Sequence, residues 1–343
     1  MHARVCARSS RVLVLFDARS VRRLIAGVLV GGLAGCTTSG NVTTLADGRH
    51  GTFPILTRTL PTRPEAVEQP GTITGDLTLP AGTARAPAII VLHSCAGVTP
   101  HDTEWAGTLN RMGYAALVVN SFSGRGVKEI CTGHASVNPG SRLADLFRAH
   151  ELLATHPRID PGRIGVLGFS HGGWIALWAS HYWYQRRFMR GTVTPPVAYA
   201  AFYPAGCNVQ LLQENDVRGA VRIFHGTADD WTTIDHCRSW VARHRAAGQD
   251  VSLVEYDGAL HGFDVAFYAR PRRLPEVVNS SGCTVVQQED GTFSDARGRR
   301  FSGASPCMTI GASMGYDARA YQQSVADLQA FFRDVFARSR SLP

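Results

Sequence analysis

The fold of this 343-residue chain is decided by the stretch Ile164-Gly165-Val166-Leu167-Gly168-Phe169-Ser170-His171-Gly172-Gly173. Its first residues are apolar and predict a buried strand, whereas the residues after Ser170 predict the start of a helix. The pattern Gly-x-Ser-x-Gly between them is typical of a serine on a tight turn from a strand into a helix. Such a turn packs closely and strains the backbone, so its flanking positions require glycine. We therefore expect Ser170 to be a nucleophile at the end of a strand.

A serine nucleophile needs a base, and the base needs an acid that orients it. In the order typical of α/β-hydrolases, the acid and then the histidine follow the serine along the chain. Asp229 follows the apolar run 221–224, and His261 follows the run 251–256. Both therefore lie just beyond the C-terminal end of a predicted strand, where open α/β sheets place their sites. We predict the triad Ser170, Asp229 and His261, with Asp229 preferred over its neighbour Asp230.

The predicted reaction also needs an oxyanion hole made of two backbone N–H groups. His171 follows the nucleophile directly, and Cys95 lies in the loop after a predicted strand at 88–92. We expect their amides to be the donors, while the sulfur of Cys95 takes no part and is available to a disulfide. We expect no cofactor, and no metal, since no Cys or His cluster shows zinc-ligand spacing.

Strand and helix patterns alternate from about residue 72 to the C-terminus. We predict strands at 74–79 (an edge strand), 88–92, 114–119, 164–167, 198–202, 221–224 and 251–256, with a turn at 160–162. We predict helices at 101–112, 141–155, 171–183, 234–247 and 316–336. This alternation predicts a doubly wound, mostly parallel sheet with helices on both faces. Together with the Gly-x-Ser-x-Gly turn, it resembles the α/β-hydrolase fold. We assign residues 71–343 to a single domain of this kind.

Residues 264–317 interrupt the alternation and are predicted to be an insertion. The segment begins three residues after His261, so its root should lie at the mouth of the site. Long segments of this kind in compact domains usually serve as lids or binding loops, or are disordered. We expect this one to be closed by a disulfide and to shape substrate choice. Its arginines at 270, 272 and 273 are interpreted as a solvated basic face, with binding of an anionic substrate as the alternative.

The N-terminus has the pattern of an export signal. Arg19, Arg22 and Arg23 precede a short apolar run at 24–30 and a run of small residues, which predicts a signal peptide at 1–35. Leu33-Ala34-Gly35-Cys36 resembles the lipobox of bacterial lipoproteins, which implies cleavage before Cys36 and its lipidation. The alternative is an ordinary cleaved signal. Residues 36–70 are predicted to be a tether and N-terminal segment with a short strand or two near 51–60. We expect an exported protein, periplasmic or a lipoprotein of the bacterial cell envelope.

The cysteine count agrees with export. Six cysteines remain after Cys6 and Cys36 are set aside, and an even number in an oxidising compartment suggests up to three disulfides. We propose the pairs Cys283–Cys307, Cys207–Cys237 and Cys95–Cys131.

The net charge of +8 does not indicate a nucleic-acid partner. Six arginines and one acid in residues 1–35 contribute +5 of it, and the rest of the chain is nearly balanced. We expect contact with a membrane only through the signal or a lipid anchor.

Several of these stretches resemble the dienelactone hydrolase family of α/β-hydrolases, over roughly residues 70–263 and the last helix. They are 92–98, Ser121-Phe122-Ser123-Gly124-Arg125-Gly126, Ser141-Arg142-Leu143-Ala144-Asp145, 160–173, Asp229 and His261-Gly262-Phe263. The resemblance implies hydrolysis of a small-molecule ester or lactone through an acyl-enzyme. The enzymes that gave the family its name use a cysteine nucleophile in the cytoplasm, whereas here the nucleophile is Ser170 and the chain is exported. A peptidase, an acyltransferase or a catalytically silent envelope binding lipoprotein are the alternatives.

Overall fold

The computed structural model describes residues 42–61, 67–133, 136–191 and 193–339. Its main sheet has eight strands in the order β1-β2-β4-β3-β5-β6-β8-β9. They are β1 (Gly51–Thr59), β2 (Gln69–Thr78), β3 (Ala86–Leu92), β4 (Ala115–Asn120), β5 (Ile159–Phe169), β6 (Ala198–Phe202), β8 (Ala220–Gly226) and β9 (Val251–Tyr256). The pairs β1–β2 and β2–β4 are antiparallel and the other pairs are parallel. The predicted mostly parallel sheet is confirmed.

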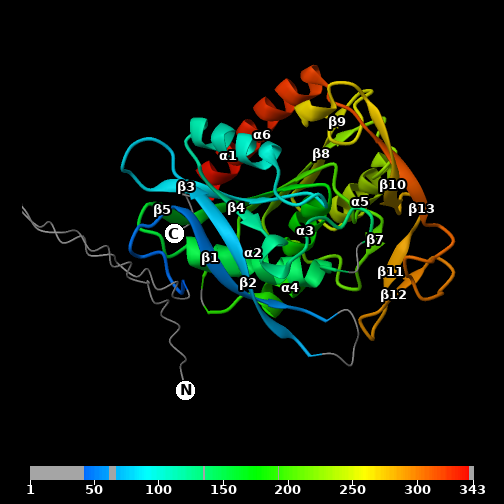
Figure 1. Cartoon of the computed structure of the whole chain (residues 1–343), viewed down its shortest axis with the longest axis horizontal. Coiled ribbons are helices and arrows are strands. Elements are labelled where there is room, and N and C mark those ends of the chain that lie inside the picture. The colour runs from blue at the N-terminus through cyan, green and yellow to red at the C-terminus, as the bar shows by residue number, and fades with distance from the viewer. Residues whose placement is uncertain (1–41, 62–66, 134–135, 192, 340–343) are drawn as a thin grey trace, which may run out of the picture. The chain divides into compact units, whose positions relative to one another are not determined.

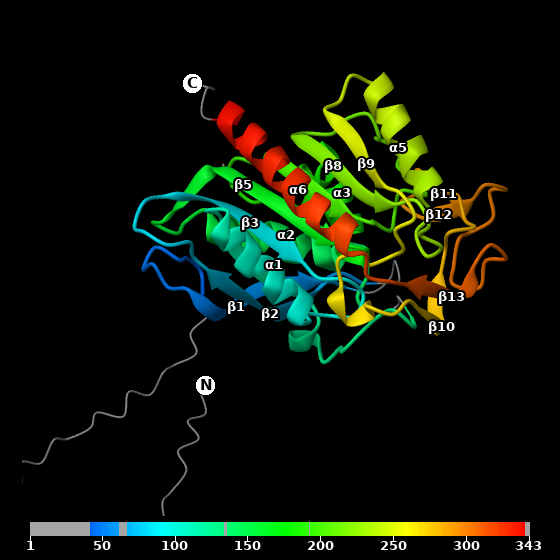
Figure 2. The same ribbon diagram turned by 90° about the horizontal axis from the view of Figure 1, so that it is seen from above.

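Helices cover both faces of this sheet, as predicted. They are α1 (Pro100–Arg111), α2 (Pro139–Leu153), α3 (His171–Ala179), α4 (Tyr182–Phe188), α5 (Ile234–Ala246) and α6 (Ala318–Ser339). Ile89 and Val91 of β3 pack in one buried cluster with residues of α1 and α6, whereas Ile90 and Leu92 pack with α2 and α3. Successive side chains of a strand point to opposite faces, so the two clusters lie on the two sides of the sheet. Helices α1 and α6 lie side by side in both ribbon views (Figures 1 and 2).

The sheet begins before the predicted domain boundary at residue 71, because β1 precedes it. Strand β1 lies within the predicted N-terminal segment 36–70 and forms the edge of the sheet, and β2, predicted as an edge strand, lies between β1 and β4. Phe53 and Ile55 of β1 are buried. Because inward side chains alternate along β1, the strand adds to the core and belongs to the domain.

Beyond shifts of a few residues at the ends of helices and strands, two other predicted elements differ in kind. The helix predicted at 171–183 is divided into α3 and α4, because the chain breaks at Ser180 and His181 to pair with residues 216–218. The Arg218 amide donates to the Ser180 carbonyl at 2.7 Å, and the Tyr182 amide donates to the Asp216 carbonyl at 2.8 Å. The turn predicted at 160–162 lies inside β5, where the register with β3 shifts.

The insertion at 264–317 folds into a short 3-10 helix and two small sheets. They contain η2 (Ala266–Tyr268), β10 (Arg272–Asn279), β11 (Val285–Gln287), β12 (Phe293–Asp295) and β13 (Thr309–Met314). Strand β10 pairs with β13, and β11 pairs with β12 and with β7 (Val209–Gln210), a strand outside the insertion. Figure 1 shows these strands, in yellow and orange, gathered on the side of β9 and α5. The insertion is therefore folded and anchored to the main domain.

All three predicted disulfides are present. The Cα atoms are 5.0 Å apart in Cys95–Cys131, 4.9 Å in Cys207–Cys237 and 5.0 Å in Cys283–Cys307. The signal predicted at 1–35 and Cys36 lie outside the described residues. Among the helices that the structure describes, none has the length and apolar character needed to cross a membrane.

Candidate active site

Ser170 lies on the turn between β5 and α3, as the sequence predicts. Its backbone has φ 52° and ψ −110°, a conformation that costs energy for a residue with a Cβ atom. A Cβ atom on Gly168 would overlap the backbone of Gly172, and one on Gly172 would overlap the carbonyl of Leu92. Only glycine fits at these two positions, so the motif is a packing requirement. The strained turn keeps the serine oxygen clear of the sheet at the C-terminal ends of the strands.

The structure brings the three predicted triad residues together. The Ser170 Oγ atom lies 3.0 Å from His261 Nε2, and His261 Nδ1 lies 2.8 Å from Asp229 Oδ2. All three side chains are nearly buried, with exposed fractions of 6%, 1% and 3% for Ser170, His261 and Asp229. Each residue follows the C-terminal end of a different parallel strand: β5, β8 and β9. This arrangement can pass a proton from the serine to the imidazole.

The loop after β8 fixes the carboxylate of Asp229. Its Oδ1 accepts hydrogen bonds from the amides of Trp231 and Thr232 at 2.8 and 2.9 Å, and its Oδ2 accepts one from the Thr232 hydroxyl at 3.0 Å. Burial alone would raise the pKa of Asp229, but His261, His225 and the Thr232 amide outweigh it and lower the pKa below its ordinary value. Asp229 is therefore held as a carboxylate facing His261.

Two aromatic side chains that the sequence interpretation missed flank the imidazole. The ring of Tyr203 lies 4.6 Å from that of His261, and the ring of Trp231 lies 4.8 Å from it on centroids. Tyr203 follows β6 with φ 34°, so a fourth strand of the sheet also ends at the site. Its position after an apolar strand is a signal that could have identified it. These rings restrict the orientation of His261 and exclude water around it.

Asp230 faces away from the triad and anchors the insertion. Its carboxylate accepts hydrogen bonds from the Ser313 amide at 2.7 Å and the Ser313 hydroxyl at 2.9 Å, and Arg273 lies within 3.3 Å. The backbone of the same loop receives a hydrogen bond from Asn279 at 2.9 Å, and Trp231 Nε1 donates to the Val278 carbonyl at 2.9 Å. The geometry thus separates the two neighbouring acids into different structural settings.

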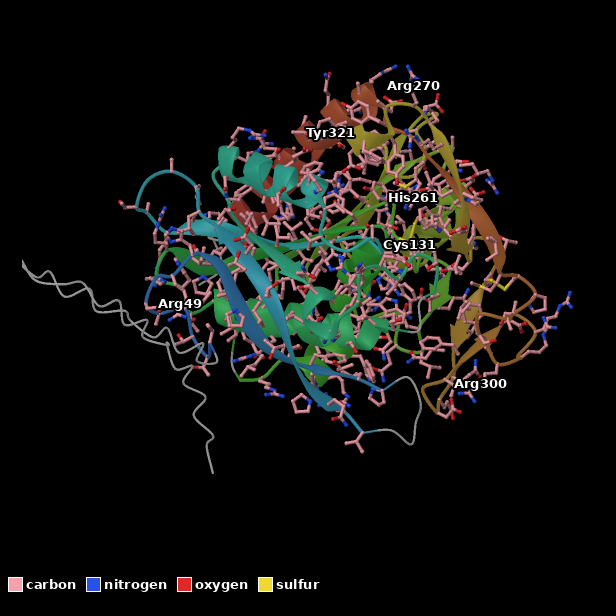
Figure 3. The ribbon with its side chains drawn as sticks, viewed as in Figure 1. Arg49, Cys131, His261, Arg270, Arg300 and Tyr321 are labelled. Atoms are coloured by element: carbon pink, nitrogen blue, oxygen red, sulfur yellow. A yellow bond between two sulfur atoms is a disulfide. The ribbon has the colours of Figure 1, made fainter. Side chains whose placement is uncertain are left out.

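The insertion's arginines line its outer surface. Arg272 stacks over the exposed ring of Phe267 at 5.5 Å, and Arg273 reaches the partly exposed Asp230. In Figure 3 the labelled Arg270 and Arg300 point outward at the periphery of the molecule, away from His261. These positions favour the interpretation of a solvated basic face.

The two segments predicted to supply the oxyanion amides lie against each other. Strand β3, which leads to Cys95, pairs with β5, and Leu92 lies opposite Gly168 in that pairing. The close approach of Gly172 to the Leu92 and His93 carbonyls joins the start of α3 to the end of β3. The disulfide Cys95–Cys131 and a hydrogen bond from the Ile130 amide to the Cys95 carbonyl at 2.8 Å fix the loop further. Among the residues that the structure describes, no group of three or more His, Cys, Asp or Glu side chains is arranged to hold a metal ion.

Two known proteins are similar in sequence to this chain. The chain is 24% identical over 213 residues to "Putative carboxymethylenebutenolidase" of Synechocystis sp., which covers 56% of this chain and 81% of the relative. It is 25% identical over 211 residues to "Probable 2-oxo-3-(5-oxofuran-2-ylidene)propanoate lactonase" of Bradyrhizobium sp., covering 56% of this chain and 79% of that relative.

Two solved structures share the fold. One is "Crystal Structure of Putative Dienelactone Hydrolase from Klebsiella pneumoniae", with a TM-score of 0.51 and 16% identity, covering 83% of this chain and 99% of that one. The other is a dienelactone hydrolase-like promiscuous phosphotriesterase from metagenomic libraries, with a TM-score of 0.50, 15% identity and the same coverage. The family model described as "Dienelactone hydrolase family" matches residues 73–273, more than half of the chain. The chain belongs to the dienelactone hydrolase family.

Proposed function

We propose that this protein is an exported serine hydrolase that cleaves a small-molecule carboxylic ester or lactone through an acyl-enzyme. The observation that carries the proposal is the continuous chain of hydrogen bonds from Ser170 through His261 to Asp229. Ser170 lies on the strained turn between β5 and α3, which is called the nucleophile elbow below. Membership of a hydrolase family supports the reaction class, and one relative is named a lactonase. The three disulfides support an oxidising compartment, which cell fractionation checks.

In the proposed mechanism His261 Nε2 removes the Ser170 hydroxyl proton as Oγ forms a bond to the substrate carbonyl carbon. The carbonyl oxygen becomes an oxyanion, which the amides of Cys95 and His171 stabilise. His261 then gives its proton to the departing alkoxide, and the bond from the carbonyl carbon to that oxygen breaks. Water, deprotonated by His261, then attacks the acyl carbon. The bond from that carbon to Ser170 Oγ breaks, His261 returns the proton to Oγ, and the acid is released. Asp229 stabilises the imidazolium in both halves.

Covalent labelling with a fluorophosphonate tests the nucleophile directly. We expect the wild type to be labelled at Ser170 with loss of fluoride, and we expect Ser170→Ala to show no labelling, as detected by intact-protein mass spectrometry. Hydrolysis of a panel of acyl esters and five- or six-membered lactones, followed in parallel, tests the reaction class. A wild type that is folded but neither labelled nor active on the panel would favour the silent binding protein instead.

A pocket beside the triad supports a role for the insertion in substrate choice. It is lined by residues 204–208 and 231–233, by His236, and by Ser280 and Ser281 of the insertion. Two of its lining residues contact the triad on the side away from the Ser170 hydroxyl: the Ala205 amide donates to the Ser170 carbonyl, and the Thr232 hydroxyl lies 3.2 Å from His261 Nδ1. We propose that this shallow hollow, which has room for little more than a water-sized group, borders the space that the outer part of the substrate occupies. Complete removal of the insertion would uncover the buried cluster that Val277 and Ala312 form with Trp231, so a point substitution is the sharper test.

Ser280→Phe is expected to narrow the pocket and change the ranking of substrates. We expect kcat/KM for bulky esters to fall by about tenfold or more relative to acetate esters, because a site discriminates by the space it offers the transition state. Fluorophosphonate labelling of Ser170 should persist. The matched control is Ala304→Phe, an exposed position of the insertion away from the pocket. An unchanged ranking in a folded Ser280→Phe variant would contradict a role for the insertion in substrate choice.

A further inference from the structure

Arg142, for which the sequence suggested no role, is a buried cation behind the nucleophile elbow. It lies in the first turn of α2, and only 1% of it is exposed. Its guanidinium donates through Nη1 to His171 Nδ1 at 2.8 Å and through Nη2 to the His93 carbonyl at 2.7 Å. Its central carbon lies 5.3 Å from the centroid of the Phe122 ring. Because a guanidinium can only donate, the contact with His171 requires that ring to be neutral with its proton on Nε2.

Among the described residues, no carboxylate forms a salt bridge with Arg142. The nearest acid along its own helix, Asp145, is already held by Arg125, with two contacts of 2.7 and 2.8 Å, and by the Thr57 hydroxyl at 2.8 Å. Burial lowers the pKa of Arg142 to about 10, so the guanidinium remains protonated near neutral pH. A buried charge that forms no salt bridge is costly, and groups of this kind are concentrated at functional sites.

The two hydrogen bonds of Arg142 join the two segments that carry the proposed oxyanion amides. His93 lies two residues before Cys95, whose amide is one proposed donor. His171, whose amide is the other, directly follows Ser170. The His93 ring extends this link: the Ser121 amide donates to its Nε2 at 3.2 Å, so its Nδ1 carries the proton and donates to the Ser94 carbonyl at 2.7 Å. That carbonyl shares a planar peptide group with the Cys95 N–H. A fixed Ser94 carbonyl therefore also fixes the direction of the Cys95 N–H.

We propose that Arg142 is a positioning residue of the oxyanion hole, which ties the Cys95 loop to the His171 segment so that both amides face the same point. This inference rests on the proposed serine-hydrolase function. Its positive charge also favours negative charge developing nearby in a site that excludes water. A positioning residue of this kind stabilises the transition state and leaves ground-state binding of the substrate unchanged.

The test compares Arg142→Met and Arg142→Lys with the wild type. Hydrolysis of p-nitrophenyl acetate gives kcat and KM, and inhibition by phenylboronic acid, which adds to a serine oxygen as a tetrahedral anion, gives an inhibition constant. We expect Arg142→Met to lose about 10²-fold in kcat, the size of effect seen when one oxyanion donor is lost. We expect Arg142→Lys to lose less, because an ammonium keeps the charge but does not span both partners. KM should stay within about threefold, and the inhibition constant of the boronic acid should rise in step with the fall in kcat.

The matched control is Arg163→Met. Arg163 is also a mostly buried arginine, but it pairs with Asp160 near the start of β5, away from the elbow. The Arg163→Met variant should have lower thermal stability than the wild type but the same kcat and the same affinity for the boronic acid. If Arg142→Met fails to fold, Arg142→Lys decides the matter, since it retains the charge and most of the stem. Folded Arg142 variants with kcat and boronic-acid affinity within about threefold of the wild type would overturn the inference.

Parallel assays of the wild type and Ser170→Ala separate this inference from the proposed function. A wild type with no activity that depends on Ser170 refutes the proposed function, and with it the role of Arg142. A wild type whose activity depends on Ser170, beside Arg142 variants of equal activity, refutes the role of Arg142 alone.

Discussion

Replacement of Ser170 by alanine is expected to lower kcat for ester hydrolysis by about 10⁵- to 10⁶-fold, and His261→Ala should lower it by a similar factor. The two side chains act as one unit, since the serine is a weak nucleophile until His261 Nε2, 3.0 Å away, accepts its proton. The double variant should therefore be little worse than either single variant. The rate of p-nitrophenyl acetate hydrolysis above the spontaneous rate gives kcat for all three variants.

The matched control is Ser324→Ala. Ser324 is fully buried in α6, where its hydroxyl donates to the Tyr321 carbonyl, so the change removes the same atom away from the site. It should retain wild-type kcat. If Ser170→Ala kept more than about a hundredth of the wild-type kcat, an acyl-enzyme on Ser170 would be excluded as the main route.

The parts of the site that the sequence could predict are those fixed by local backbone geometry. Gly168 and Gly172 indicate the turn that carries Ser170, because a Cβ atom at either position would overlap neighbouring backbone. Asp229 and His261 could be placed because the ends of parallel strands meet at one edge of a sheet. The even number of cysteines left fifteen pairings open, and the three pairs were proposed from the places of the cysteines in the insertion, in loops near the end of the sheet and beside the oxyanion segment.

The parts that it could not predict depend on contacts across the fold. Arg142 reaches the elbow only because α2 packs beside α3, and an arginine in a helical pattern usually indicates a solvated face. The rings of Tyr203 and Trp231 meet His261 from two different loops. The strand near 51–60 was predicted but assigned to a tether, because residues 37–70 are rich in Thr, Pro and Gly; only its pairing with β2 shows that it belongs to the sheet.

Asp229→Asn is expected to lower kcat by about 10⁴-fold, which corresponds to about 5.4 kcal/mol of lost transition-state stabilisation. The reason lies in which atom of the new amide faces His261. The Trp231 and Thr232 amides donate to Oδ1 of Asp229, so the asparagine oxygen must take that position and its NH₂ group must face His261 Nδ1. An N–H there requires Nδ1 to accept, which places the imidazole proton on Nε2. The base then presents a proton to Ser170 where it should accept one.

Asp230→Asn is the matched control, because it makes the same chemical change one residue along the chain. The Asp230 carboxylate is partly exposed and accepts from the Ser313 amide and hydroxyl, and an asparagine oxygen can still accept from that amide. We expect kcat within about threefold of the wild type, since neither the charge nor the hydrogen bonds of Asp230 reach His261. Steady-state kinetics and thermal melts of both variants check the comparison. A larger loss of kcat in Asp230→Asn than in Asp229→Asn would show that Asp230 is the acid of the triad. The insertion that holds Asp230 would then be part of the catalytic machinery.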